Sequence, residues 1–92
     1  MWASCRTAHI DALEYFVEQM DVTRRLIDMY PDDLYFAKTA QDIEDAMAQG
    51  KIASLIGVEG GHAISSNLGM VRIFYELGAR YMTLTHNCNT PW

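Results

Sequence analysis

The continuous apolar run Ile52-Ala53-Ser54-Leu55-Ile56-Gly57-Val58 sets the fold class of this chain. Its hydrophobic character does not alternate, which is typical of a strand buried on both faces of a parallel sheet. Such a strand needs helices on both faces of its sheet. We therefore predict one fully buried strand over residues 52–58, within an α/β fold.

Helical and strand patterns alternate upstream of this run. Apolar residues at helical spacing predict a helix over residues 11–30. Pro31 ends this helix, because the residue before a proline disfavours helical geometry. The short aromatic-rich run at 34–37 then predicts a strand or an extended link.

Start and stop signals bound two further helices. Thr39, with Asp42 three residues later, predicts a capping box, and Gly50 is typical of the end of that second helix. The polar residues 65–67 can cap a third helix, which Gly78 ends. We expect the third helix to bury its apolar side chains, namely Leu68, Val71, Phe74, Tyr75 and Leu77.

A last strand is predicted over residues 81–85, directly before His86. The order helix, short strand, helix, strand, helix, strand indicates parallel strands joined by helices. Glu59 follows the central strand just as His86 follows the last one. Because parallel strands joined by a right-handed crossover end on the same edge of a sheet, both side chains should lie on that edge. The active sites of α/β enzymes lie on this edge.

Glu59 and His86 are the candidate functional residues of this edge. A carboxylate at the end of an apolar strand is costly unless it is paired or binds a metal. Gly60-Gly61 allow the backbone to turn sharply and to approach a ligand. The alternative for Glu59 is a structural residue that binds loop amides or an arginine. The alternative for His62 is a hydrogen bond within its own loop, and His9 is typical of a solvated helix start.

The composition limits the classes of function. The 92 residues, half of them hydrophobic, suit one small domain. Seven basic against twelve acidic residues leave no electrostatic footprint for nucleic acid or an anionic membrane. No apolar run approaches the about 20 residues that a bilayer crossing needs. The spacing of Cys5 and Cys88 fits neither a zinc knuckle nor a redox pair, and two free thiols remain an alternative to a bond.

Two longer motifs resemble the signature stretches of the membrane (renal) dipeptidases. The first is Ala53-Ser54-Leu55-Ile56-Gly57-Val58-Glu59-Gly60-Gly61-His62, and the second is Tyr81-Met82-Thr83-Leu84-Thr85-His86-Asn87-Cys88-Asn89-Thr90-Pro91-Trp92. Residues 18–21 and 29–31 resemble the preceding helix of that family and its end. The resemblance therefore covers nearly the whole chain from Cys5 onward.

This resemblance implies a role for each candidate residue. Members of the family are (β/α)8 barrels that hydrolyse dipeptides with a water activated by two zinc ions. By position, Glu59 would bridge the two zinc ions, and His86 would contact the substrate and support the developing oxyanion. Cys5 and Cys88 match a family disulfide, which forms in an oxidising compartment. The resemblance also implies a homodimer that is secreted or held on the outer face of the cell membrane by a lipid anchor.

A whole barrel takes about 250 residues, so the resemblance implies that residues 1–92 are an internal fragment of a single hydrolase barrel domain. About two to three consecutive β/α units of the barrel are expected here. The remaining zinc ligands of the family, a His-x-Asp pair and two later histidines, fall outside this chain. We therefore expect the 92 residues alone to be inactive, and the alternative is a non-enzymatic α/β interaction module derived from the barrel.

Overall fold

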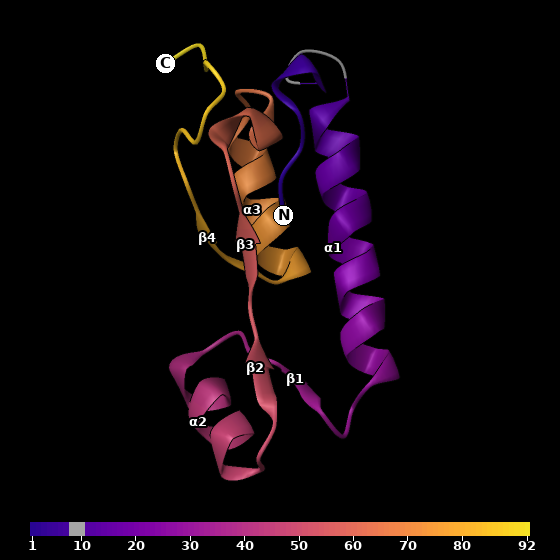
Figure 1. Cartoon of the computed structure of the whole chain (residues 1–92). Coiled ribbons are helices and arrows are strands. Elements are labelled where there is room, and N and C mark those ends of the chain that lie inside the picture. Colours follow the sequence, from indigo (N-terminus) through magenta and orange to yellow (C-terminus); the bar gives the residue numbers. More distant parts are fainter. Residues whose placement is uncertain (8–10) are drawn as a thin grey trace.

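The computed structural model describes residues 1–7 and 11–92, and its helices alternate with short strands, except that two strands follow one another after α2 (Figure 1). A 3-10 turn at Cys5–Thr7 precedes α1 (Ala12–Met29), β1 (Leu34–Phe36), α2 (Ala40–Ala48), β2 (Ile52–Ser54), β3 (Ile56–Val58), a 3-10 turn at Gly61–Ile64, α3 (Leu68–Leu77) and β4 (Ala79–Met82). Strands β1 and β2 pair in parallel, and so do β3 and β4. The fold is therefore mixed α/β with short parallel strands. The prediction for His9 lies outside the described residues.

The capping box predicted for α2 is confirmed. The hydroxyl oxygen of Thr39 accepts the Asp42 N–H at 3.1 Å, and the Asp42 carboxylate accepts the Thr39 N–H at 2.9 Å. The same carboxylate accepts the Lys38 N–H at 2.7 Å. This bond from Lys38 is the main reason why the pKa of Asp42 lies below its usual range. Local sequence therefore determines where α2 begins.

The predicted limits of α3 are confirmed, but its predicted burial is wrong. Asn67 caps the helix by accepting the Gly69 N–H at 2.8 Å. Gly78 ends it with φ +110°, where a β-carbon would also run into the ring of Phe36. Among the apolar side chains of α3, only Phe74 is buried. The others are exposed or half-buried because α3 packs mainly on β4 and the Gly61–Ile64 turn, and no other described element packs closely on its outer side.

The central strand is neither continuous nor fully buried, contrary to the prediction. It breaks at Leu55 into β2, which pairs with β1, and β3, which pairs with β4. Ile56 and Val58 are 1% and 2% exposed, whereas Ile52 in β2 is 66% exposed. Each half of the run has a different neighbouring strand, and these neighbours determine how far it is buried.

The last strand also differs from its prediction, because β4 spans Ala79–Met82 rather than residues 81–85. The Thr83 N–H still donates to the carbonyl of Val58 at 3.0 Å. Since β3 ends at Val58, the chain leaves the sheet after Thr83. His86 therefore lies in a loop beyond β4 rather than directly at the end of a strand.

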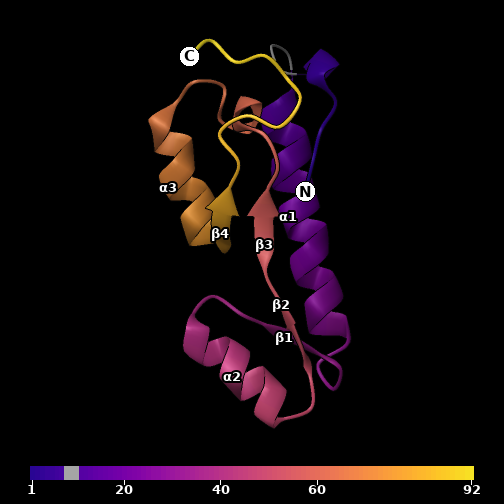
Figure 2. The same cartoon turned by 60° about the vertical axis from the view of Figure 1, so that its left-hand side comes forward.

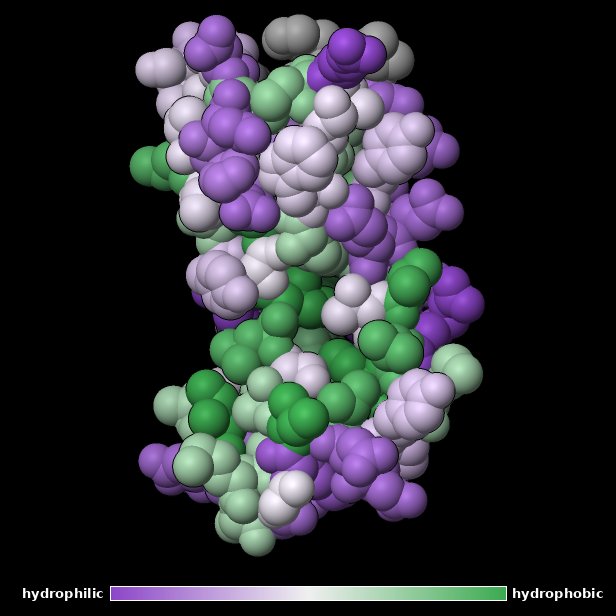
Figure 3. All heavy atoms as spheres, in the orientation of Figure 1, coloured by the Kyte–Doolittle hydropathy of each residue, from purple (hydrophilic) through white to green (hydrophobic). Residues whose placement is uncertain are grey.

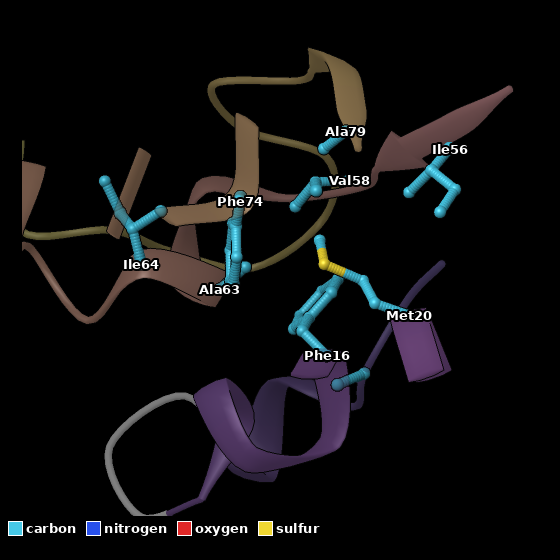
Figure 4. Packing of buried hydrophobic residues seen from close by; sticks show 9 residues of the cluster. Phe16, Met20, Ile56, Val58, Ala63, Ile64, Phe74 and Ala79 are labelled. Atoms are coloured by element: carbon cyan, nitrogen blue, oxygen red, sulfur yellow. The ribbon is translucent and has the colours of Figure 1, made fainter. Parts of the chain in front are cut away.

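The core lies between α1 and the β3–β4 pair (Figure 4). Phe16 and Met20 of α1 meet residues of β3, the Gly61–Ile64 turn, α3 and β4, namely Ile56, Val58, Ala63, Ile64, Phe74 and Ala79. Strands β1 and β2 and helix α2 extend away from this core (Figure 2). The molecule consequently measures 43 × 22 × 22 Å, and its radius of gyration of 14.2 Å exceeds the about 12 Å of a compact domain of this length.

Candidate functional site

Glu59 is held by its backbone at the carboxyl end of β3. Its N–H donates to the carbonyl of Met1 at 2.9 Å. The N–H of the next residue, Gly60, donates to the Thr83 hydroxyl at 2.7 Å. The Glu59 side chain itself remains 47% exposed. The carboxylate is thus accessible, while the chain on both sides of it is restrained.

Glycine is required at the turn that follows Glu59. Gly60 has φ +108°, and a β-carbon there would run into the imidazole of His62. A β-carbon at Gly61 would run into the carbonyl of Leu84 and the ring of Trp92. The Gly61 N–H donates to that same carbonyl at 3.1 Å. The two glycines therefore allow the chain to leave β3 and to lie against the loop beyond β4.

His86 lies beside Glu59, as expected for two residues on the same edge. Its Nδ1 atom is 3.4 Å from Oε1 of Glu59, and the two side chains are 42% and 47% exposed. A contact between groups this exposed adds little stability, because water screens it. A ligand can therefore displace it at small cost.

A disulfide ties the His86 loop to the start of the chain. Cys5 and Cys88 are bonded, with their Cα atoms 5.2 Å apart and a sequence separation of 83. The structure therefore has the bond that the resemblance implies rather than two free thiols. Because Cys88 is only two residues beyond His86, the bond limits how far the His86 loop can move.

His62 is a buried residue whose Nε2 lies 3.8 Å from Sγ of Cys88. Its side chain does not bond within its own loop: Nε2 lies 2.9 Å from the carbonyl of Ala3. A carbonyl only accepts, so Nε2 carries the proton. Nδ1 has no hydrogen-bond partner among the described residues, and the ring meets Phe16 edge-on at 5.6 Å. This burial favours a structural role over a catalytic one.

The N-terminal segment was missed by the sequence patterns. The Met1 nitrogen donates to the carbonyl of Gly57 and the Met1 carbonyl accepts the Glu59 N–H, both at 2.9 Å. This arrangement of bonds, opposite Val58, is that of a parallel strand pair. A segment of so few residues is too short to show strand periodicity, so no sequence signal could have identified it.

The donor set fits part of a metal site. Among residues 1–7 and 11–92, no group of three or more histidine, cysteine, aspartate or glutamate side chains is arranged to hold a metal ion. Glu59 nevertheless offers a carboxylate, which is a usual zinc ligand, on the edge of the sheet where it is accessible. These residues can contribute one carboxylate and a neighbouring imidazole to a larger site.

Comparison with known proteins agrees with this arrangement. The model of the membrane dipeptidases, peptidase family M19, matches residues 1–92. The chain belongs to this family. The resemblance of the two signature motifs is thereby confirmed. This membrane dipeptidase chain is also 44% identical over 88 residues to Dipeptidase 3 of Mus musculus, a match that covers 96% of the chain.

The chain spans 17% of the length of that relative. Its similarity to the membrane dipeptidases therefore concerns the segment around Glu59 and His86 rather than a whole enzyme. None of the helices among the described residues combines the length and the apolar character needed to cross a bilayer.

Proposed function

We propose that this chain supplies part of the active site of a zinc-dependent dipeptidase. Residues 1–92 would form about two to three β/α units of a (β/α)8 barrel, whose active site lies at the carboxyl ends of the strands. The observation that carries the proposal is the approach of His86 to within 3.4 Å of Glu59 on that edge. Membership of the membrane dipeptidase family supports a peptidase.

In this proposal the Glu59 carboxylate would bridge the two zinc ions, since carboxylate oxygens are usual zinc ligands. The bonds of the backbone to Met1 and Thr83 hold Glu59 in place before any metal arrives, which favours binding. The other ligands belong to segments of the parent protein beyond these residues. When bound, two zinc ions would lower the pKa of a water that they share, so that hydroxide is available near neutral pH.

His86 is proposed to contact the dipeptide substrate. Its imidazole can donate a hydrogen bond to the carbonyl oxygen of the scissile peptide bond, where negative charge develops. The ring is 42% exposed and lies two residues before the anchored Cys88. It is therefore accessible to a substrate while its loop is held.

We further propose that the parent protein works outside the cell as a homodimer. It would be secreted or held on the membrane by a lipid anchor that lies outside this chain. The Cys5–Cys88 disulfide supports this location, because such bonds persist in oxidising compartments.

Glu59→Gln in the full-length parent protein tests the metal role. A neutral amide is a poor bridging ligand, so this variant should lose most of its zinc, measured by elemental analysis, and its dipeptide hydrolysis. Glu44→Gln is the matched control, because Glu44 is exposed on α2 and lies away from the edge with Glu59. Full zinc content and full activity in Glu59→Gln would rule out the bridging role.

His86→Ala separates the second role from the first. It should keep its zinc and lose about 10²- to 10³-fold in kcat, which is typical of removing one oxyanion donor. Loss of zinc from this variant, or an unchanged kcat, would contradict the proposed substrate contact.

A further inference from the structure

The side-chain amide of Gln19 holds the main chain of Trp2 at two points. Its Oε1 accepts the Trp2 N–H at 3.1 Å, and its Nε2 donates to the Trp2 carbonyl at 3.0 Å. A primary amide has both a donor and an acceptor, so it can bond to the N–H and the carbonyl of one residue, as a neighbouring strand would. Gln19 precedes Met20, which is 1% exposed, so the core of the protein fixes its place on α1.

Met1 transmits this restraint to Glu59. The Met1 nitrogen and carbonyl bond to Gly57 and Glu59 of the β3 segment, each at 2.9 Å. Met1 and Trp2 are consecutive, so the clamp on Trp2 and the bond to Glu59 belong to one short piece of main chain. Gln19 is thereby linked to the proposed zinc ligand through two sets of hydrogen bonds.

The two segments that bond to the main chain at Glu59 and Gly60 are held in place by different contacts. On one side, Gly60 bonds to Thr83, which is itself bonded to Val58 and follows β4 directly. On the other side stands the Met1–Trp2 segment, which belongs to no assigned strand. Its anchors are the Gln19 clamp on Trp2, the bond of His62 to Ala3 and, further along, the Cys5–Cys88 disulfide. The Gln19 clamp is the anchor nearest to Met1, so removing its amide weakens the side of Glu59 that Met1 holds.

We propose that Gln19 is a positioning residue for the Glu59 carboxylate. It holds Met1 and Trp2 against β3, so that Glu59 leaves the strand in one direction and presents its oxygens at a fixed place. The expected effect on zinc binding rests on the proposed zinc function of Glu59. The restraint on the Glu59 backbone does not depend on a metal. Gln19 lies on α1 and its bonds to Trp2 are solvent-exposed, so its substitution leaves no cavity in the core.

Gln19→Met tests the proposal, because methionine keeps the length and the helix propensity of the side chain and lacks the amide. In the full-length protein, the zinc dissociation constant should rise about tenfold, the lower end of what losing an outer contact costs a metal site. Competition with a chromophoric chelator measures it. In zinc-free protein, hydrogen–deuterium exchange should be faster at the Glu59 amide and unchanged at the Thr83 amide.

Gln41→Met is the matched control. Gln41 is also a helical glutamine, but it is exposed and its amide donates to Asp45 within α2 at 2.9 Å, away from Glu59. This variant should change neither the zinc dissociation constant nor the exchange of Glu59. A purely structural Gln19 would lower the melting temperature of Gln19→Met and leave both of those quantities as they are, and that result would overturn the proposal.

The outcomes separate this inference from the proposed function. If Glu59→Gln strips the zinc and Gln19→Met binds it with unchanged affinity, only the positioning role is wrong. If Glu59→Gln keeps its zinc, the proposed metal role is wrong. The exchange rate of the Glu59 amide then still decides whether Gln19 restrains that residue.

Discussion

Ile52 and Ile56 stand four residues apart in one apolar run, yet Ile52 is 66% exposed and Ile56 only 1%. Strand β3, which holds Ile56, lies between β4 and the Met1 segment and packs against α1. Strand β2, which holds Ile52, has β1 on one side and packs against α2. Figure 3 shows hydrophobic surface gathered around the middle and lower part of the molecule, near β2. Apolar sequence alone therefore does not decide which half of the run is buried.

The two halves also differ in how they are closed. The β3 half carries Glu59 and His86 and is tied by the Cys5–Cys88 disulfide. Both halves leave large apolar side chains in solvent: Met29, Met47 and Ile52 in the half with β2, and Leu68, Tyr81 and Leu84 in the half with β3. In the proposed barrel, further strands and helices would cover these side chains. The candidate site thus lies in the half that holds the buried core and the disulfide.

Removing the disulfide should have the largest effect on the half of the molecule that contains β3. For a loop of 83 residues, the chain-entropy model gives a stabilisation of roughly 4 to 5 kcal/mol. Cys5→Ser combined with Cys88→Ser should lower the free energy of unfolding by that order, measured by urea denaturation. Amide exchange should become faster in β3 and β4 and change little in β2 and α2. Equal acceleration in both halves would show that they unfold as one unit.

The two isoleucines allow a direct test of burial with one residue type. Ile56→Ala should cost about 2 to 5 kcal/mol, because it leaves a cavity in the core. Ile52→Ala should cost less than about 1 kcal/mol, because most of that side chain is already in water. Urea denaturation of the two single variants measures the difference. Equal losses would mean that β2 is buried in solution as deeply as β3.

A smaller effect is expected at the start of α2, in the open half. Thr39→Ala removes the capping hydroxyl and should cost about 1 kcal/mol, as the loss of a helix cap usually does. Amide exchange should become faster in α2, while β3 and β4 keep their protection. Loss of protection in β3 as well would mean that the two halves are coupled more strongly than their contacts indicate.

The smallest effect is a pH dependence at the same cap. The Lys38 N–H holds the pKa of Asp42 below its usual range in the folded chain. The ionised carboxylate therefore stabilises α2 above the ordinary pKa of aspartate, and this contribution is lost as the pH falls through the lowered folded value, below about pH 4. Amide chemical shifts of α2 followed by NMR during acidification should show this loss, and Asp42→Asn should abolish it. Identical acid titrations of the two proteins would refute the role of Asp42.

Features that depend on neighbouring residues in sequence could be predicted, and those that depend on distant partners could not. Thr39, Asn67 and Gly78 mark helix ends because capping needs only nearby residues. The approach of Glu59 and His86 followed from the topology of parallel strands, which place their carboxyl ends on one edge.

The break at Leu55 and the bonds of Gln19 to Trp2 arise only when segments far apart in the chain meet. No sequence period signals such contacts. The pairing of Cys5 with Cys88 is a third case. Their spacing in sequence was compatible with two free thiols, and only the family resemblance implied the bond.

The central claim is that Glu59, beside His86 at the carboxyl end of β3, binds metal in the parent enzyme. A crystal structure of the zinc-loaded full-length protein, with anomalous scattering recorded at the zinc absorption edge, tests it most directly. The claim predicts one zinc ion at about 2.0 to 2.2 Å from each carboxylate oxygen of Glu59. Zinc ions coordinated elsewhere, with the Glu59 carboxylate in contact with none of them, would contradict it.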